Sequence, residues 1–418
     1  MLIILSLLKI HTMRIRYSLI LTLCVSLTAF SQQFDPTKIE KHISILASDS
    51  LEGRGTGQKG EQMAAAYITS EFKKLKLKPM GDSKTYLQAF TYKGGTHGEG
   101  PGGTANNIVA FLDNKAKTTI IIGAHYDHLG VGEQGSSLDA NPAGKIHNGA
   151  DDNASGVAGV IELANYFTNN KKKEADNFLF ITFSGEELGL FGSKYFTEHP
   201  TIDLATVNYM INMDMVGRLN PDTKALMIHG TGTSPVWEPL IKKLDDGKFK
   251  ISTDSSGVGP SDHTSFYLKD LPVLHFFTGS HSDYHKPSDD TDKINAQGEA
   301  DVLTLIAKII DAPETQSKLG FLKTKSKDMG TRSAFKVTLG IMPAYTSDVA
   351  GLKVDGVTEG RAGEKAGMQT GDIVIQMGEY KINDIQDYMK ALGNFEGGQT
   401  IDVVVKRGEE EVTLKVTF

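Results

Sequence analysis

Hydrophobic positions follow two different patterns along the chain between about residues 34 and 312. Nearly continuous apolar runs are typical of strands that are covered on both faces; they lie at residues 119–124, 177–183, 208–213 and 271–277. Between them, apolar residues recur at helical spacing, at residues 58–77, 154–167 and 301–310. We therefore predict an α/β domain with a mostly parallel sheet flanked by helices.

The pattern changes after residue 312. Residues 313–330 are polar and rich in lysine, with Pro313 and two glycines, as expected of a linker between folded units. Beyond it, β-rich stretches lie near residues 335–341, 371–377 and 401–405, with a helix near 383–392. We predict a first domain, a linker and a small β-rich second domain, at residues 32–312, 313–330 and 331–418.

The N-terminus has the pattern of a signal peptide. Arg14 and Arg16 precede an apolar stretch at residues 17–30, and the small residues Ala29 and Ser31 follow at its end. The stretch is shorter than the roughly 20 apolar residues that span a bilayer. We predict that residues 1–31 are removed and that the mature chain is secreted or periplasmic, without a stable membrane span.

The composition argues against certain metal sites, disulfides and partners. The only cysteine, Cys24, lies in the predicted signal peptide, so disulfides and cysteine-ligated metals are excluded from the mature chain. The net charge is −7, and the one dense basic run, at residues 171–173, is followed by acids. This balance argues against nucleic acid as a partner.

Histidines and acids gather where the four predicted strands end. The carboxyl ends of the strands in an open α/β sheet form the edge at which sites are found. Paired acids beside a buried strand are also costly unless a cation satisfies them. The residues at or just beyond these ends are His125, Asp127, Glu186, Glu187, Asp214 and His285.

Two adjacent acids, Asp151 and Asp152, come between a glycine-rich loop at residues 130–149 and a predicted helix. A helix N-terminus explains one of them, because it favours acids. The second favours contact with a cation, although spacing alone does not say which of the two makes it. The long loop itself favours a functional role.

Four histidines compete for the position after the last strand. His275 alternates within the strand, which favours a core position, whereas spacing does not separate His263, His281 and His285. Asp127 is well placed to hydrogen-bond the second ring nitrogen of a metal-bound His125. Two imidazoles and three carboxylates, without a thiolate, suit two zinc ions if one carboxylate bridges them.

The ordered set of motifs over about residues 37–311 resembles the zinc aminopeptidases of the bacterial leucyl aminopeptidase and aminopeptidase Y type. The resemblance implies their zinc-peptidase fold, which is of the phosphorylase/hydrolase-like kind. The motifs lie at residues 46–49, 52–57, 125–127, 149–156, 186–187, 212–215, 261–263 and 284–285.

The resemblance also implies a role for each candidate. His125 and Asp214 would hold one zinc ion, Glu187 and His285 would hold the other, and Asp152 would bridge the two. Glu186 would be the general base, taking a proton from the metal-bridging water and passing it to the departing amine. The implied substrates are peptides with a free amino terminus.

Residues 331–418 resemble a PDZ domain of the bacterial protease-associated kind. Residues 339–342 would form the loop that receives a peptide carboxylate, and residues 360–372 match the turn typical of these domains. A peptide would then add to the sheet as an extra strand. The alternative is a packing module without a ligand.

Three other functions fit parts of the pattern. Glutaminyl cyclases share the fold, but as a family they use one zinc ion and lack the His-x-Asp pair present here at His125 and Asp127. Dinuclear carboxypeptidases and deacylases insert a lid domain, for which the span between Asp214 and His285 is too short. A non-catalytic scaffold leaves the complete ligand set and Glu186 unexplained.

Overall fold

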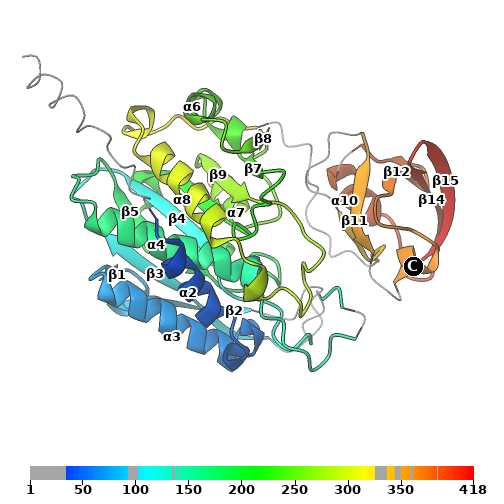
Figure 1. Cartoon of the computed structure of the whole chain (residues 1–418), viewed down its shortest axis with the longest axis horizontal. Helices are drawn as coiled ribbons and strands as arrows, with labels where there is room; N and C mark the ends of the chain where they lie inside the picture. Colours follow the sequence, from blue (N-terminus) through cyan, green and yellow to red (C-terminus); the bar gives the residue numbers. More distant parts are fainter. Residues whose placement is uncertain are drawn as a thin grey trace, which may run out of the picture.

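The computed structural model describes two folded regions. Figure 1 draws the first, from blue to yellow, as a sheet with helices on its faces, and the second, in orange and red, as a smaller β-rich unit. The predicted signal peptide lies outside the described residues. These are residues 34–92, 102–133, 137–139, 141–324, 337–343, 350–357, 361–383 and 385–418.

A nine-stranded sheet forms the centre of the first region, in the order β1-β3-β5-β4-β6-β9-β7-β8 with β2 paired to β3. The central pairs β4–β5, β4–β6 and β6–β9 are parallel, whereas β3 and β7 run antiparallel to their central neighbours β5 and β9. The strands are β1 (Lys78–Pro79), β2 (Leu87–Tyr92), β3 (Gly103–Leu112), β4 (Thr119–His125), β5 (Asn177–Phe183), β6 (Val207–Met213), β7 (Ala225–His229), β8 (Lys250–Asp254) and β9 (Val273–Phe277).

The four predicted strands are β4, β5, β6 and β9, and the predicted fold class is confirmed. Successive side chains of each strand point to opposite faces of the sheet. On β4, Ile120 and Ile122 belong to one hydrophobic core and Ile121 to the other. Every residue of β4, β5 and β6 is buried, which is why these strands are continuously apolar in sequence.

Helices cover both faces of this sheet (Figure 1). Helices α2, α3, α4, α6 and α8 contribute side chains to one core, and α5 and α7 contribute to the other. Their bounds are α2 (Pro36–Leu46), α3 (Lys59–Lys74), α4 (Gly156–Asn169), α5 (Phe191–Glu198), α6 (Trp237–Leu244), α7 (His263–Tyr267) and α8 (Ala296–Ile310). Short helical turns are η1 (Asp49–Arg54), η2 (Asp82–Lys84), η3 (Ala150–Ser155), η4 (Leu204–Thr206), η5 (Thr231–Thr233), η6 (Thr291–Lys293) and η7 (Pro313–Thr315).

The described part of the predicted linker, residues 313–324, packs against the first domain. Leu319 is buried in the same core as α8, and the backbone N–H of Leu322 donates to the carbonyl of Thr233 at 2.8 Å. The hydroxyls of Thr324 and Tyr267 lie 2.9 Å apart. These residues find apolar and hydrogen-bonding partners on the surface of the first domain.

The second region is an antiparallel sheet in the order β10-β11-β12-β14-β15, with β13 paired to β12. It has its own hydrophobic core, and burial alternates along β14 as expected for a sheet with one face in water. Its elements are β10 (Ile341–Pro343), β11 (Leu352–Val357), α9 (Ala362–Lys365), β12 (Ile373–Met377), β13 (Tyr380–Lys381), α10 (Ile385–Leu392), β14 (Thr400–Arg407) and β15 (Glu410–Thr417).

No helix in the described parts of the chain combines the length and the apolar character needed to cross a membrane.

Candidate metal centre

The fold brings all the predicted ligands to one edge of the sheet. His125 ends β4, Asp214 directly follows β6, and Glu187 follows β5. Asp152 comes from η3, at the start of α4, and His285 lies in the loop after β9. These five side chains and Glu186 line one pocket.

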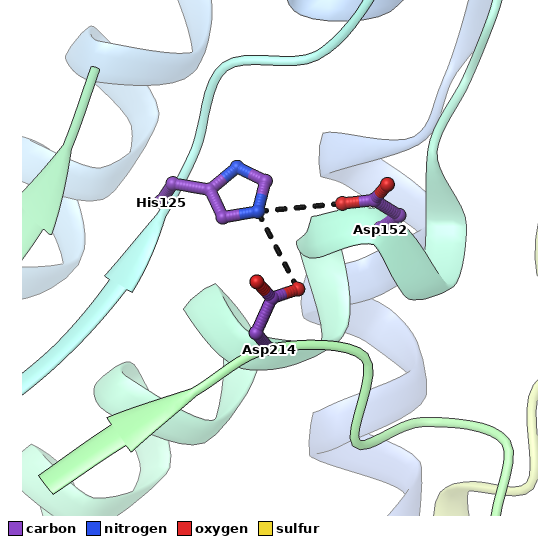
Figure 2. Close-up of side chains that lie close together, drawn as sticks. All are labelled: His125, Asp152 and Asp214. Atoms are coloured by element: carbon purple, nitrogen blue, oxygen red, sulfur yellow. Dashed lines mark ion pairs between the residues drawn. The ribbon is translucent and has the colours of Figure 1, made fainter. Parts of the chain in front are cut away.

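The first half-site joins His125, Asp152 and Asp214. Figure 2 shows the ring of His125 with its Nε2 toward both acids. This nitrogen is 3.3 Å from Oδ1 of Asp152 and 3.5 Å from Oδ1 of Asp214. Its other nitrogen, Nδ1, is 3.2 Å from the backbone oxygen of Asp127. Because a carbonyl only accepts, Nδ1 carries a proton, which leaves the lone pair of the neutral ring on Nε2.

The second half-site joins His285, Asp152 and Glu187. Nε2 of His285 is 3.2 Å from Oδ2 of Asp152 and 3.2 Å from Oε2 of Glu187. The two oxygens of Asp152 therefore face different half-sites.

These separations fit zinc. With ligand bonds of about 2.0–2.1 Å in a tetrahedral zinc site, neighbouring ligand atoms lie about 3.3–3.4 Å apart. The four nitrogen–oxygen distances of the two half-sites, 3.2–3.5 Å, are close to that value. The ligand types are also those that zinc takes, imidazole and carboxylate.

The electrostatics of the centre favour positive charge. Burial lowers the pKa of His125, but the carboxylates of Asp214 and Glu186 outweigh it, and the pKa lies well above its usual value. His285 behaves in the same way, because Glu187 and Asp152 raise its pKa against the effect of burial. A bound dication would supply the charge that these clustered acids otherwise draw from protonated imidazole.

Glu186 lies beside the ligands and differs from them in its environment. Burial raises its pKa well above the ordinary value, and the nearby acids Asp262 and Asp214 add to this effect against the attraction of His125. Its Oε2 is 4.0 Å from Nε2 of His125. A carboxylate with a raised pKa suits a general base that must accept and then release a proton.

Asp127 makes a different contact from the predicted one. The nearest acceptor for Nδ1 of His125 is the backbone oxygen of Asp127, while the carboxylate Oδ1 lies farther away, at 3.7 Å. The carboxylate instead accepts from the hydroxyl of Thr56 at 2.7 Å and from the backbone N–H of Glu186 at 3.1 Å. Asp127 thus connects the loop of His125 to the backbone of Glu186.

The geometry separates the candidates that spacing left open. Asp151 turns away from the centre: its Oδ1 accepts from the backbone N–H of Gly217 at 2.7 Å, and its Oδ2 faces His281 at 3.3 Å. His281 therefore contacts Asp151, and not the pocket acids. His263 and His275 stack with ring centroids 4.5 Å apart.

Three residues near the centre were missed in the sequence. The ring of His128 contacts Glu187, with Nδ1 2.7 Å from Oε1. Oδ2 of Asp289 accepts from the backbone N–H groups of Asp151 and Asp152 at 3.0 and 3.1 Å. His128 could have been noticed in the sequence, because it is a second imidazole in the loop that begins at His125. Nothing in the sequence around Asp289 indicates a comparable role.

The third residue near the centre that was missed in the sequence is Arg54, from the motif at residues 52–57. It is buried, with 1% of its surface exposed. No carboxylate among the described residues forms an ion pair with it. Its guanidinium instead donates to backbone oxygens on three segments of the chain, at the end of α2 and in two loops, those of Leu46, Tyr126, Asn148 and Gly149.

The turn into η3 requires glycine at position 149. Gly149 has a φ of +56°, and a Cβ there would lie 2.1 Å from the backbone oxygen of Asp152 and 2.5 Å from the ring of His128. The peptide bond between Asp152 and Asn153 is cis. The end of the predicted functional loop is thus packed directly against the centre.

Comparison with known proteins gives two domain families. Residues 107–310 match peptidase family M28, and residues 319–418 match the PDZ domain. Leucine aminopeptidase 2 of Trichophyton equinum is 28% identical over 186 residues, which are 42% of this chain and 36% of that protein. The chain thus spans well under half of the length of this curated relative.

Solved structures support the same fold. Glutaminyl cyclase from Porphyromonas gingivalis aligns with a TM-score of 0.54 at 18% identity, covering 66% of this chain and 98% of that one. A zinc aminopeptidase from Bacillus subtilis aligns with a TM-score of 0.51 at 16% identity, covering 69% and 98%. These structures show the fold, and the two family matches identify a domain of peptidase family M28 at residues 107–310 and a C-terminal PDZ domain at residues 319–418.

Proposed function

We propose that this chain is an aminopeptidase with two zinc ions, in which His125 and Asp214 hold one ion, Glu187 and His285 hold the other, and Asp152 bridges them. The observation that carries the proposal is the orientation of Asp152, whose Oδ1 faces His125 and whose Oδ2 faces His285. A carboxylate between two half-sites is the arrangement that a bridged pair of ions requires.

Bound zinc would lower the pKa of a coordinated water and stabilise the negative charge that develops on the substrate carbonyl. The chain's own contribution to proton transfer is Glu186, whose raised pKa suits both directions of transfer. Glu186 would accept a proton from the attacking water and deliver it to the departing amine. Asp127, through its hydrogen bond to the Glu186 N–H, would hold the base in place.

Substrate class is proposed from the pocket and the relatives together. The pocket continues past the ligands to Met215, Pro260 and Phe277, which would contact the side chain of the substrate's first residue. The Trichophyton equinum relative is named a leucine aminopeptidase. Peptides with a free amino terminus are therefore the proposed substrates.

We also propose a location for the enzyme and a role for its second domain. The signal-peptide pattern at residues 1–31 supports a secreted or periplasmic enzyme. The PDZ match supports capture of a peptide or chain terminus by the second domain.

The second candidate function is glutaminyl cyclisation, because a glutaminyl cyclase shares the fold. The second half-site argues against it. Nε2 of His285 lies 3.2 Å from Oδ2 of Asp152 and 3.2 Å from Oε2 of Glu187, which supports room for a second ion where cyclases, as a family, use one.

The test compares wild-type protein with Glu186→Gln on a series of aminoacyl amides. We expect the variant to keep its zinc and to lose activity by about 10²–10⁴-fold, the usual contribution of a general base. Glu198→Gln, an exposed acid on α5, is the matched control and should remain fully active. An active Glu186→Gln protein would overturn the assigned base.

An N-acetylated peptide and an N-terminal glutaminyl peptide complete the series. Cleavage of the acetylated peptide would overturn the requirement for a free amino terminus. Ammonia release with cyclisation of the glutaminyl peptide, without release of amino acids, would favour the cyclase.

A further inference from the structure

We propose that His128 positions Glu187 by donating a hydrogen bond to Oε1, so that only Oε2 is left to bind the second zinc ion. This inference rests on the proposed function, because it assigns a role within the second half-site. It makes His128 a positioning residue and not a metal ligand.

Distances distinguish the two roles. Nδ1 of His128 lies 2.7 Å from Oε1 of Glu187, whereas Nε2 of His285 lies 3.2 Å from Oε2 of the same carboxylate. The shorter distance is that of a charge-assisted hydrogen bond. The longer one is close to the roughly 3.3 Å between two ligand atoms on one zinc ion. Nδ1 of His128 is also 3.9 Å from the bridging carboxylate of Asp152.

The direction of the hydrogen bond follows from the charge of Glu187. Glu187 binds zinc in the proposed function, and a carboxylate that binds a metal ion is ionised. An ionised carboxylate only accepts. The proton therefore sits on Nδ1 of His128.

The ring of His128 is closely packed. Its backbone N–H donates to the carbonyl of Arg54 at 3.1 Å, and its surface is fully buried. Gly149 packs against the ring so closely that a Cβ there would lie 2.5 Å from Cδ2. The second nitrogen, Nε2, is buried and has no hydrogen-bond partner among the described residues.

This arrangement restricts Glu187 to one metal-facing oxygen. Without His128, the buried Oε1 would lose its donor, and the carboxylate could rotate or bind through both oxygens. Outer partners of this kind change metal affinity by about 10–100-fold when removed. The effect should fall on the second ion, because the acids within 4.0 Å of His128 are Glu187 and the oxygen of Asp152 that faces His285.

The test is zinc titration of the metal-free full chain, in competition with a chelator of known affinity, for wild type and three variants. His128→Leu removes the donor, and His128→Asn places an amide N–H near the position of Nδ1. His42→Leu is the control for loss of a buried histidine, since His42 bonds to Tyr67 and Glu162 elsewhere in the domain.

We expect His128→Leu to weaken one of two zinc-binding steps by about 10–100-fold, while His128→Asn stays within a few-fold of wild type and His42→Leu binds both ions normally. Circular dichroism of each metal-free variant checks folding. If His128→Leu does not fold, His128→Asn carries the test: normal binding supports the positioning role, and loss of one step contradicts it.

Three results would overturn the inference: unchanged binding by His128→Leu, equal weakening by the Leu and Asn variants, or weakening of both steps. Equal weakening, together with a changed visible spectrum of the Co²⁺-substituted protein, would identify His128 as a ligand. Failure of wild-type protein to bind two ions would instead count against the proposed function, so the two failures are distinguishable.

Discussion

The two half-sites of the proposed metal centre are built from different kinds of structure. His125 and Asp214 stand at the ends of the neighbouring parallel strands β4 and β6, which are paired up to Gly123 and Asn212. Glu187 and His285 lie farther from the ends of β5 and β9, in loops. His285 has a φ of +54°, and its carbonyl accepts from the backbone N–H of Leu138 at 2.9 Å.

This difference lies in how the two half-sites are held in place. The ladder of the sheet fixes the first half-site, whereas side-chain contacts, such as that between His128 and Glu187, must fix the second. Loops held by few backbone hydrogen bonds open more easily than central strands. We call the first the strand half-site and the second the loop half-site.

The largest effect should come from Asp152→Ala, because this change removes the one side chain that both half-sites share. We expect the protein to retain less than about one zinc per chain and to lose aminopeptidase activity to background. The matched control is Asp151→Ala, since Asp151 faces His281 and the backbone of Gly217. If Asp151→Ala lost its metal and Asp152→Ala kept it, the bridging assignment would be wrong.

Removal of metal by a chelator should separate the half-sites. We expect zinc to leave in two phases, first from the loop half-site and then from the strand half-site, because local opening is easier in loops. His285→Ala should abolish the fast phase and His125→Ala the slow one, as measured by a zinc-sensitive dye after mixing with EDTA. Release in a single phase, or the opposite assignment of the phases, would contradict the comparison.

Asp289→Ala should lower the free energy of unfolding by about 1–3 kcal/mol, the cost of leaving buried donors without a partner. Oδ2 of Asp289 accepts from the backbone of Asp151 and Asp152. Urea unfolding of metal-free protein can be followed by fluorescence of Trp237, the only tryptophan and a buried residue of the first domain. The exposed Asp292, changed to Ala, should alter stability by less than about 0.5 kcal/mol.

Behind the strand half-site, His263 should make stability depend on pH. Burial is the main cause of its low pKa, about 3 in the folded chain, against about 6.5 when unfolded. Between these values the unfolded chain binds a proton that the folded chain does not, so stability is lost as the pH falls below about 6.5.

His263→Phe would keep the ring stacked on His275 and remove the titration. We expect wild type to lose about 1.4 kcal/mol more stability than the variant for each pH unit between 6 and 4, measured by urea unfolding of metal-free protein. A wild type and variant with parallel pH dependence would show that this histidine does not titrate on unfolding.

The sequence pattern placed the two residues of the proposed strand half-site at one edge of the sheet, and it did so for a physical reason. Continuous apolar runs locate β4 and β6, and a polar residue directly after such a run must lie at the edge of the sheet. His125 and Asp214 could therefore be placed together from the sequence alone. The antiparallel strands β3 and β7 were not predicted, because the first half of β3 is polar or small and β7 has only four consecutive apolar residues.

The loop half-site could not be predicted in this way. Spacing left Asp151 and Asp152 equivalent, because neighbouring residues in η3 point in directions that depend on the turn at Gly149. It also left His281 and His285 equivalent, and it gave no reason to connect His128 with Glu187. The resemblance to known aminopeptidases chose Asp152 and His285, and the contacts of Asp151 and His281 agree with that choice.

The central claim is that Asp152 joins two metal half-sites, and the most direct test is the ratio of zinc to protein in the purified full chain, measured by mass spectrometry of the metal. We predict about two zinc ions per chain after removal of loosely bound metal. A ratio of about one would leave only one half-site functional and would favour cyclase-like chemistry. Protein that binds no zinc when it is supplied would contradict the proposed mechanism.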